Sequence, residues 1–362
     1  MKVGIDAFPM SGRITGIGRY VLEICRALDE IMPDSEFYLY SPKPLAVDLP
    51  SRRWHLRICG SRVVRMGISY VWLKVTVRAM AVQDGVHVFW ATRTILPARS
   101  RFFYTVATVH DLNYLICPKS MSYTTLLAHR LWFARDVRRA DAVVTNSQGT
   151  ADRLRYMLGV TADAVARPGV AEPFGPQADE VVAARLSALG LQKPYFLAVS
   201  TLEPRKNLKT LVEVFVSLKR SGELRGYELL IAGSRGWRTG RLHRVLDECE
   251  VHGVRWLGFV TDEDLAALYA ASQAFFFPSL YEGFGIPVAE ARACGALVVA
   301  TDMPELRESA GAHAIFVQPT TQGIRQGLLK AAQGKPLTCC HERRFTWADA
   351  ANVMAQQFRR VE

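Results

Sequence analysis

The sequence predicts an α/β protein built from two doubly wound, parallel-sheet (Rossmann-like) domains. Short apolar runs alternate with longer amphipathic segments in both halves of the chain, a rhythm typical of βαβ units. The rhythm stops around residues 167–176, where proline and glycine are dense, and then starts again. The 362 residues, 49% of them hydrophobic, suffice for two cores. We therefore expect domains at 1–172 and 173–340, and a helix at 341–362 that packs back on the first domain.

Apolar runs followed by a turn and a helical pattern are expected as strands. In the first domain they are Lys2–Ala7, Phe37–Tyr40, Val86–Trp90, Thr105–His110 and Ala142–Asn146. In the second they are Tyr195–Val199, Glu228–Ala232, Val254–Trp256, Ala274–Phe277 and Ala296–Ala300. Ligands of such sheets bind outside the carboxyl ends of the strands. We therefore expect the two domains to face each other across a ligand cleft, with the site residues just after the strands.

The net charge of +11 is concentrated in the first half of the chain. Residues 1–175 hold 23 Lys and Arg against 14 Asp and Glu, whereas the remainder holds 22 against 20. The segment 52–78 has no acidic residue and mixes cations with large apolar side chains. This mixture suits an anionic membrane surface. The alternative is a solvated basic face whose apolar members are core, and no sequence signature supports nucleic-acid binding.

Other features favour a cytoplasmic chain. The first residues resemble a strand and not an export signal. The longest apolar stretch, Ile68–Val82, is interrupted by Lys74 and Arg78 and is too short to span a membrane, which takes about 20 apolar residues. The seven cysteines include no C-x-x-C pair, as expected for reduced, buried thiols.

The most informative segment follows the strand Ala274–Phe277. A glycine-rich loop, Glu282-Gly283-Phe284-Gly285-Ile286, leads to Pro287, which suits the first turn of a helix. The free amides of this turn and the helix dipole form an anion site suited to a diphosphate. Glu282 and Glu290 can accept hydrogen bonds from sugar and ribose hydroxyls. The structural alternative is that Glu290 only complements the helix dipole.

A second segment, Ser200-Thr201-Leu202-Glu203-Pro204-Arg205-Lys206-Asn207, follows the strand Tyr195–Val199. Adjacent cations at the end of a strand suit the neutralisation of a diphosphate, and of the charge that grows on it as a glycosidic bond breaks. We therefore expect Arg205 and Lys206 to act as an electrophilic clamp. The alternative is a helix-start turn with exposed basic residues.

The E-x7-E spacing of Glu282 and Glu290, with the Glu-Pro-Arg-Lys-Asn string, resembles the retaining nucleotide-sugar glycosyltransferases of the GT-B fold, family 4. The likeness covers most of the chain and is greatest for bacterial mannosyltransferases of surface-polysaccharide synthesis. It implies that Glu282 holds donor-sugar hydroxyls near C3 and that Glu290 holds the ribose. Some relatives carry another arginine where Ser200 stands, so the resemblance does not fix the clamp at that position.

The resemblance implies the transfer of a hexose, best mannose or a related deoxyhexose from a GDP-sugar, to a lipid-linked saccharide in lipopolysaccharide, O-antigen or exopolysaccharide synthesis. UDP- and dTDP-sugars remain alternative donors, because no residue can be assigned to the recognition of guanine. Since no carboxylate stands out as a nucleophile, we favour front-face attack with retention. A sugar-nucleotide epimerase and a non-catalytic sugar-nucleotide-binding protein are the alternatives from other classes.

Near the N-terminus, Gly16-Ile17-Gly18-Arg19-Tyr20 lies between the first strand and a helix. Val21 stands where a dinucleotide fingerprint needs its third glycine, which disfavours a nicotinamide cofactor. The resemblance implies that this loop approaches the donor phosphates and the acceptor, whereas a purely conformational turn is the alternative. It also implies that His110 contacts the donor sugar and stabilises an oxocarbenium-like transition state, and that Asp111 orients His110 or touches the acceptor.

Several weaker candidates also follow strands. Gly233 and the run Gly258-Phe259-Val260 would flank the nucleobase through backbone groups, and Ser147 is either a helix N-cap or a residue lining the site. Asp262-Glu263-Asp264 has the D-x-D form of metal-diphosphate sites, but we expect it to begin a helix capped by Thr261 or Asp262. We expect no metal and no cofactor, because Arg205, Lys206 and a helix N-terminus supply the positive charge.

Overall fold

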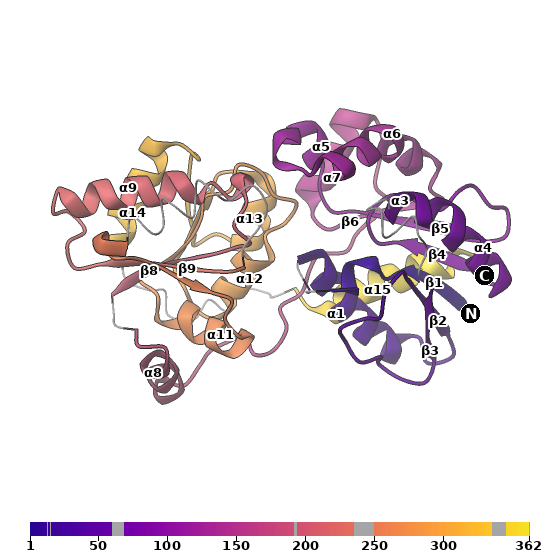
Figure 1. Ribbon diagram of the computed structural model, residues 1–362, viewed down its shortest axis with the longest axis horizontal. Coiled ribbons are helices and arrows are strands. Elements are labelled where there is room, and N and C mark those ends of the chain that lie inside the picture. The colour runs from indigo at the N-terminus through magenta and orange to yellow at the C-terminus, as the bar shows by residue number, and fades with distance from the viewer. Residues whose placement is uncertain are drawn as a thin grey trace. The chain divides into compact units, whose positions relative to one another are not determined.

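The computed structural model describes residues 1–12, 14, 16–59, 69–191, 194–234, 250–334 and 345–361. The chain forms two compact units, shown in Figure 1. Unit 1 comprises Met1–Gly169 and Phe345–Glu362, and unit 2 comprises Val170–Arg344. The chain thus leaves unit 1 three residues before the expected boundary after residue 172.

Unit 1 contains a seven-stranded sheet in the order β3-β2-β1-β4-β5-β6-β7, with every pair of neighbours parallel. The order runs outward in both directions from β1 and β4, as in a doubly wound sheet. The strands are β1 (Lys2–Asp6), β2 (Glu36–Ser41), β3 (Trp54–Ile58), β4 (Val88–Ala91), β5 (Tyr104–Val109), β6 (Ala142–Thr145) and β7 (Ala164–Val165).

Helices connect these strands and cover the sheet. The longer ones are α1 (Gly16–Ile31), α6 (Tyr123–Arg139), α7 (Gln148–Leu158) and α15 (Trp347–Phe358). The shorter ones are η1 (Phe8–Met10), α3 (Ser69–Trp72), η2 (Leu73–Val77, a π-helical turn), α4 (Arg78–Gln83), α5 (Asn113–Ile116), η3 (Pro118–Ser120) and η6 (Arg359–Val361). The C-terminal α15 packs against α1, and Figure 1 shows the two helices side by side.

Unit 2 repeats the plan with a six-stranded parallel sheet in the order β10-β9-β8-β11-β12-β13. Its strands are β8 (Tyr195–Val199), β9 (Glu228–Ala232), β10 (Val254–Gly258), β11 (Ala274–Phe277), β12 (Val298–Thr301) and β13 (Ile315–Val317). Its helices are α8 (Asp179–Ala188), η4 (Pro204–Lys206), α9 (Leu208–Arg220), η5 (Glu250–His252), α11 (Asp262–Ala271), α12 (Ile286–Ala293), α13 (Pro304–Ala310) and α14 (Thr321–Gln333).

The predicted fold class, two parallel Rossmann-like sheets, is confirmed. The central strands β8, β9 and β11 have the predicted bounds, because strands buried on both faces are continuous apolar runs. The strands β3, β7 and β13 lie at or next to sheet edges and were not predicted. Edge strands carry more polar residues and are shorter, so their sequences lack that signal.

Strand β3 lies within the basic segment 52–78. The Trp54 ring stacks on Phe37 at 4.0 Å and is buried. Arg57 Nη2 lies 2.8 Å from Asp84 Oδ1, and Arg53 and Lys74 form ion pairs with Asp29 and Asp136. This part of the segment therefore fits the alternative stated above, a basic face whose apolar members are core. Residues 60–68, with Arg62 and Arg65, lie outside the described residues.

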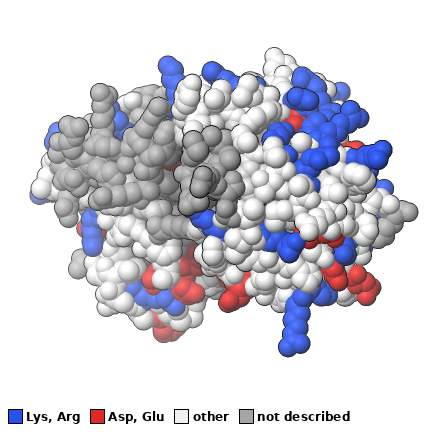
Figure 2. All heavy atoms as spheres, turned by 45° about the vertical axis from the view of Figure 1, so that its right-hand side comes forward, with Lys and Arg blue, Asp and Glu red and all other residues white. Residues whose placement is uncertain are grey.

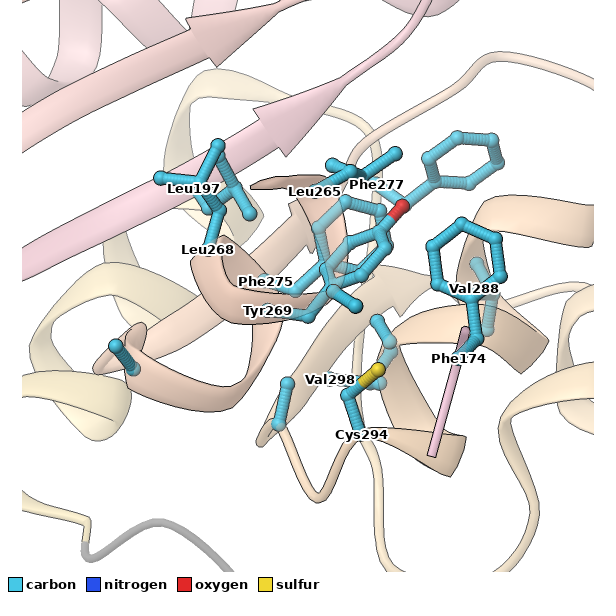
Figure 3. Packing of buried hydrophobic residues seen from close by; sticks show 14 of the residues in the cluster. Phe174, Leu197, Leu265, Leu268, Tyr269, Phe275, Phe277, Val288, Cys294 and Val298 are labelled. Carbon is cyan, nitrogen blue, oxygen red and sulfur yellow. The ribbon is translucent and has the colours of Figure 1, made fainter. Parts of the chain in front are cut away.

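The core of unit 2 lies beneath the loops that follow β8 and β11. Figure 3 shows Phe275 and Phe277 of β11 packed with Tyr269 of α11 and Val288 of α12. These side chains are buried and fix the directions in which β11 ends and α12 begins.

Two further predictions concern the cysteines and the absence of a membrane-spanning helix. Cys25 and Cys294 are buried and Cys59 and Cys117 are partly buried, whereas Cys249, Cys339 and Cys340 lie outside the described residues. Among the helices that the structure describes, none is both long enough and apolar enough to cross a bilayer.

Candidate active site

The loop between β11 and α12 places Glu282. Helix α12 begins at Ile286, after Gly285, which adopts a left-handed conformation with φ of 89°. Pro287 is the second helical residue, one position later than expected, where its missing N–H again costs no hydrogen bond. Phe284 is buried and the glycines have no side chain, so a ligand would meet Gly283, Phe284 and Gly285 mainly through their backbone groups, whereas Ile286 is partly exposed.

The turn that follows β8 places Arg205 and Lys206. Both residues belong to η4, which ends at Asn207 with φ of 56° before α9 begins. Because β8 and β11 are parallel neighbours, their carboxyl ends lie at the same edge of the sheet. The Leu280 amide donates to the Arg205 carbonyl at 2.8 Å, which ties the two loops together.

The three charged residues form one cluster. Arg205 Nη1 lies 2.8 Å from Glu282 Oε2, and Lys206 Nζ lies 2.7 Å from Glu282 Oε1. Arg205 Nη1 also donates to the Tyr281 carbonyl at 2.6 Å. The Glu282 side chain is 9% exposed, and those of Arg205 and Lys206 are 13% and 14% exposed. The sequence predicted each of these residues, and the structure brings them into direct contact.

The cluster keeps its carboxylate charged. Burial alone would raise the pKa of Glu282, but the positive charges of Arg205 and Lys206 outweigh that effect and lower the pKa to about 2. Burial lowers the pKa of Lys206, and the Glu282 carboxylate opposes that change. The Lys206 ammonium lies 5.0 Å from the centre of the Phe277 ring, which offers a further favourable contact. Glu203 Oε2 lies 3.9 Å from Arg205 Nη2, so the ion-paired group contains two cations and two carboxylates and has no net charge.

The second glutamate of the motif lies inside the helix. Glu290 is in the second turn of α12 and is 5% exposed. A carboxylate inside the helix body is poorly placed to complement the dipole, whose influence falls off beyond the first turn. Glu290 is thus a buried residue of the helix that directly follows the loop of Glu282.

Three more predicted residues meet where β8, β9 and β10 end. The Gly233 amide donates to the Gly258 carbonyl at 2.6 Å, and the Ser200 amide donates to the Ala232 carbonyl at 3.0 Å. Gly233 has φ of 137°, and a Cβ atom there would lie 2.0 Å from the Ser200 carbonyl oxygen. Only glycine fits this position without rearrangement.

The two residues after Gly258 point in different directions. Phe259 is 65% exposed, whereas Val260 packs against the core of unit 2. Phe259 is therefore the more accessible of the two side chains, and Val260 is partly buried.

In unit 1, His110 follows β5 and is 8% exposed. Its Nε2 donates to the Thr92 carbonyl at 2.8 Å, and its ring contacts Tyr20 edge-on at 4.9 Å. Burial lowers the pKa of His110, so the ring is neutral near pH 7. Asp111 Oδ1 accepts a hydrogen bond from the Asn113 amide at 2.9 Å, which shapes the turn before α5.

The glycine loop begins α1. Gly16 is the first residue of the helix, and a Cβ atom there would meet nothing within 4 Å. At Gly18 a Cβ atom would lie 2.6 Å from the Pro9 carbonyl oxygen. Packing against Pro9 therefore explains why position 18 is a glycine. This agrees with the alternative given above, in which the turn has a conformational role only.

Sequence reasoning missed a polar cluster at the carboxyl ends of β1 and β4. The fully buried Asp6 pairs with Arg93, whose Nε lies 2.8 Å from Asp6 Oδ2. The Arg93 guanidinium also lies 4.9 Å from the centre of the Tyr70 ring. Nearby, burial lowers the pKa of His129 to about 4, against the smaller opposing effect of Asp111. Asp6 lies near the end of the predicted strand Lys2–Ala7, and Arg93 follows the predicted strand Val86–Trp90, so these positions are the signal that could have revealed them.

The D-x-D triplet lies at the start of α11. The Thr261 hydroxyl caps this helix by accepting a hydrogen bond from the Asp264 amide at 3.2 Å, and Asp264 pairs with Arg185 at 2.9 Å. The Ser147 hydroxyl likewise caps α7, accepting from the Thr150 amide at 2.9 Å. Within the described ranges, no group of three or more His, Cys, Asp or Glu side chains is placed to hold a metal ion.

Comparisons with known proteins agree with this architecture. The family model described as "Glycosyl transferases group 1" matches residues 157–337, half of the chain. The O-antigen chain mannosyltransferase B of Escherichia coli is 27% identical over 353 residues, which cover 92% of this chain and 91% of that protein.

Two further similarities differ in extent. The serotype-specific mannosyltransferase WbdA of E. coli is 29% identical over 293 residues, which cover 74% of this chain but 34% of that protein. Among solved structures, the sucrose-phosphate synthase of Thermosynechococcus elongatus superposes with a TM-score of 0.78 at 18% identity, over 100% of this chain and 99% of that one. At this identity the superposition bears on the fold.

Proposed function

This chain belongs to the group 1 glycosyl transferases and has the GT-B fold, and from that membership we propose which reaction it performs. It transfers mannose or a related deoxyhexose from a GDP-sugar to a lipid-linked saccharide, with retention of the anomeric configuration. The product serves O-antigen, other lipopolysaccharide or exopolysaccharide synthesis. The similarity to O-antigen mannosyltransferases supports the choice of sugar and product.

The cluster of Glu282, Arg205 and Lys206 is the observation that carries this proposal. A buried carboxylate between two partly buried cations, at the carboxyl ends of neighbouring strands, is suited to a ligand that bears both hydroxyls and phosphates. Arg205 and Lys206 attract the donor diphosphate and stabilise the negative charge that it gains as the sugar leaves.

Glu282 keeps capacity for the donor sugar. An ionised carboxylate offers about four acceptor positions, and the two ion pairs occupy one on each oxygen. The remaining positions can accept hydrogen bonds from donor-sugar hydroxyls. Glu290, on the helix that follows, is proposed to accept from the ribose hydroxyls, while the backbone of Gly233 and Gly258 borders the base.

The proposed transfer takes place on one face of the sugar. The bond from the anomeric carbon to the diphosphate oxygen breaks, the acceptor hydroxyl oxygen bonds to the same face of that carbon, and the leaving diphosphate takes the hydroxyl proton. We propose that no metal ion takes part, because Arg205, Lys206 and the α12 N-terminus supply the positive charge. The acceptor is presented at the inner face of the cytoplasmic membrane, where the enzyme associates peripherally.

A thermal-shift panel of GDP, UDP, dTDP and ADP tests the donor. A ligand present at 100 times its dissociation constant adds about 2.7 kcal/mol to the free energy of unfolding. We expect GDP to give the largest shift. A larger shift with UDP or dTDP would replace the donor class, and no shift with any nucleotide would contradict donor binding.

Incubation with GDP-mannose, with and without a saccharide acceptor, tests the reaction. Transfer that depends on the acceptor, with the product anomer identified by nuclear magnetic resonance, is the expected result. Conversion of the donor without acceptor would indicate an epimerase, and binding without turnover would indicate a non-catalytic protein.

A further inference from the structure

Unit 1 contains a basic pocket of about 850 Å³ at the amino ends of β5 and β6, a volume within the range of ligand pockets. Helix α4 with the turn before it, the loop 98–103 and the last turns of α6 form its walls. Two carboxylates, Asp136 and Asp141, line it. Its six cationic side chains are Lys74, Arg78, Arg99, Arg101, Arg135 and Arg139.

The carboxylates of the pocket are already occupied. Asp136 is 1% exposed and binds Lys74, Arg139 and the Leu96 amide. Asp141 accepts hydrogen bonds from the amide and hydroxyl of Thr105 at 2.8 and 2.7 Å. These contacts hold the floor of the pocket in place. The other cations of the pocket form no ion pair with either carboxylate.

Four cations of the pocket remain available to a ligand. Within the part of the chain that the structure describes, Arg78, Arg99, Arg101 and Arg135 have no carboxylate within ion-pair distance, and all but Arg78 are exposed. Figure 2 shows lysine and arginine atoms gathered, with few acidic atoms among them, on the side of the molecule where unit 1 lies. Such a concentration of like charge in a concave site favours an anionic ligand.

Large apolar side chains lie at the rim of the pocket. Phe102, which lines it, is 56% exposed, and Leu131 of α6 is 57% exposed one turn before Arg135. An exposed apolar surface beside arginines is typical of proteins that lie on an anionic bilayer, where the apolar groups enter the headgroup layer.

We propose that this pocket binds the phosphate group of an anionic membrane lipid. The guanidinium groups of Arg99, Arg101 and Arg135 hold the phosphate oxygens, and Phe102 and Leu131 enter the apolar layer next to the headgroup. An arginine can donate two parallel hydrogen bonds to one phosphate, so a concave set of arginines holds a discrete headgroup. The inference rests on the proposed function in one respect, that the acceptor lies on a membrane.

The position of the pocket separates it from the donor. Strand β5 runs from the pocket at Thr105 to His110, and its residues rise by about 3.3 Å each, so the two ends lie roughly 17 Å apart. The pocket is therefore distinct from the strand ends to which the donor-site predictions refer. Of its cations, only Lys74 and Arg78 belong to the basic segment 52–78.

Sedimentation with phosphatidylglycerol and phosphatidylcholine vesicles tests the proposal. The wild-type protein should sediment with mixed vesicles at low salt and not with pure phosphatidylcholine. Each cation near an anionic surface contributes roughly fivefold to binding, so Arg99→Ala/Arg135→Ala should lower the partition coefficient by roughly 30-fold. The control Arg26→Ala/Lys43→Ala removes the same charge elsewhere in unit 1 and should change it less than threefold.

The outcomes separate a pocket from a diffuse attraction. Equal losses in both double variants, or equal binding to both kinds of vesicle, would overturn the proposal. Inorganic diphosphate should displace the protein from vesicles at a lower ionic strength than sodium chloride does, because it competes for the arginines. Equal displacement by diphosphate and by sodium chloride at matched ionic strength would also overturn the proposal. Binding of diphosphate by a protein that does not bind vesicles would overturn it as well.

A second variant tests the rim, and a nucleotide assay keeps the two proposals apart. Phe102→Ala/Leu131→Ala should weaken vesicle binding even at high salt, where the charge effect is screened, and should leave the melting temperature unchanged. The nucleotide-induced thermal shift should be the same in wild type and in Arg99→Ala/Arg135→Ala. Loss of vesicle binding with an intact nucleotide shift identifies the lipid site alone, whereas an absent nucleotide shift with normal vesicle binding contradicts only the donor proposal.

Discussion

Two groups of cations in this protein lie in opposite surroundings. Arg205 and Lys206 of unit 2 are only 13% and 14% exposed and share the carboxylate of Glu282, whereas Arg99 and Arg135 of unit 1 are exposed and face an open pocket. Each pair lies at the end of a parallel sheet, but one is at the carboxyl ends of its strands and the other is at the amino ends.

The difference shows what burial demands of a charge. A cation largely removed from water is costly unless a partner compensates for it, and Glu282 provides that compensation for Arg205 and Lys206. The exposed pair stays solvated and needs no partner. A buried cluster with fixed partners suits chemistry on one bound group, and an exposed cluster suits attraction to a surface.

The largest expected effect is the loss of the shared carboxylate. Glu282→Ala removes the carboxylate that Arg205 and Lys206 share and leaves Arg205 only the more distant Glu203, and removal of one partner from a buried ion pair typically costs about 3–5 kcal/mol. We expect a loss of stability of that size in urea unfolding, and a fall in sugar transfer of more than about a hundredfold. Glu263→Ala, an exposed glutamate on α11, is the control. Near wild-type transfer by a correctly folded Glu282→Ala protein would remove this residue from the proposed mechanism.

Replacing one arginine by alanine in each of the two groups of cations tests the comparison directly. Arg205→Ala should lower kcat by roughly 10²–10³-fold, because one donor to a developing negative charge is worth about 2.7–4 kcal/mol. Arg135→Ala should leave transfer to a soluble acceptor within about threefold of wild type. Initial rates at saturating donor measure both. Similar losses from the two substitutions would mean that the pocket also serves the reaction.

Two histidines of unit 1, the buried His110 and the partly buried His129, lack the compensation that Glu282 has. Both folded pKa values lie below the unfolded value near 6.5, and that of His129 is about 4, so between pH 6.5 and 4 the unfolded chain binds a proton at His129 that the native state does not. The free energy of unfolding should therefore decrease as the pH falls through this range, by up to about 1.4 kcal/mol per pH unit from His129, and His110 acts in the same direction. Glu282, with a folded pKa of about 2, loses its contribution only below about pH 4.3.

Urea unfolding across this pH range measures the effect. His129→Phe should reduce the slope, whereas the same substitution at His55, whose side chain is 42% exposed, should not. A slope that both variants leave unchanged would show that His129 stays solvated.

The smallest effect is expected at the D-x-D triplet. Asp262→Asn and added EDTA should each change the transfer rate by less than about twofold, because the triplet begins α11 and Asp264 is bound to Arg185. A rate that EDTA abolishes and Mg²⁺ or Mn²⁺ restores would contradict the proposed metal-independent mechanism.

The fold and the local order of the site could be predicted, but the contacts between distant residues could not. Parallel strands buried on both faces are apolar runs, and the residues just after them were identified as site candidates for that reason. The sequence brings Lys206 near Arg205, yet it cannot show that Glu282, 76 residues beyond Lys206, binds both. The pair Asp6 and Arg93, 87 residues apart, was missed for the same reason.

Strand β3 and the basic pocket show the other limit of sequence reasoning. In β3 charged residues alternate with apolar ones, and Arg57 is bound by Asp84 on a different element, so the strand resembled a free basic surface. The pocket draws its cations from three separate segments, so no run of sequence contains it. Burial and pairing are properties of the folded chain, and they decide which cations remain available.

The return of the chain to unit 1 has a consequence for synthesis. Residues 170–344 form unit 2 without any later segment, but α1 and Trp90 of unit 1 pack against α15, through contacts that include Tyr20 with Trp347 and Trp90 with Phe358. At about 5–20 residues per second, the 175 residues of unit 2 take roughly 10–35 s to translate. During that time the nascent unit 1 exposes the apolar surface that α15 later covers, so the unit begun first on the ribosome is the one completed last.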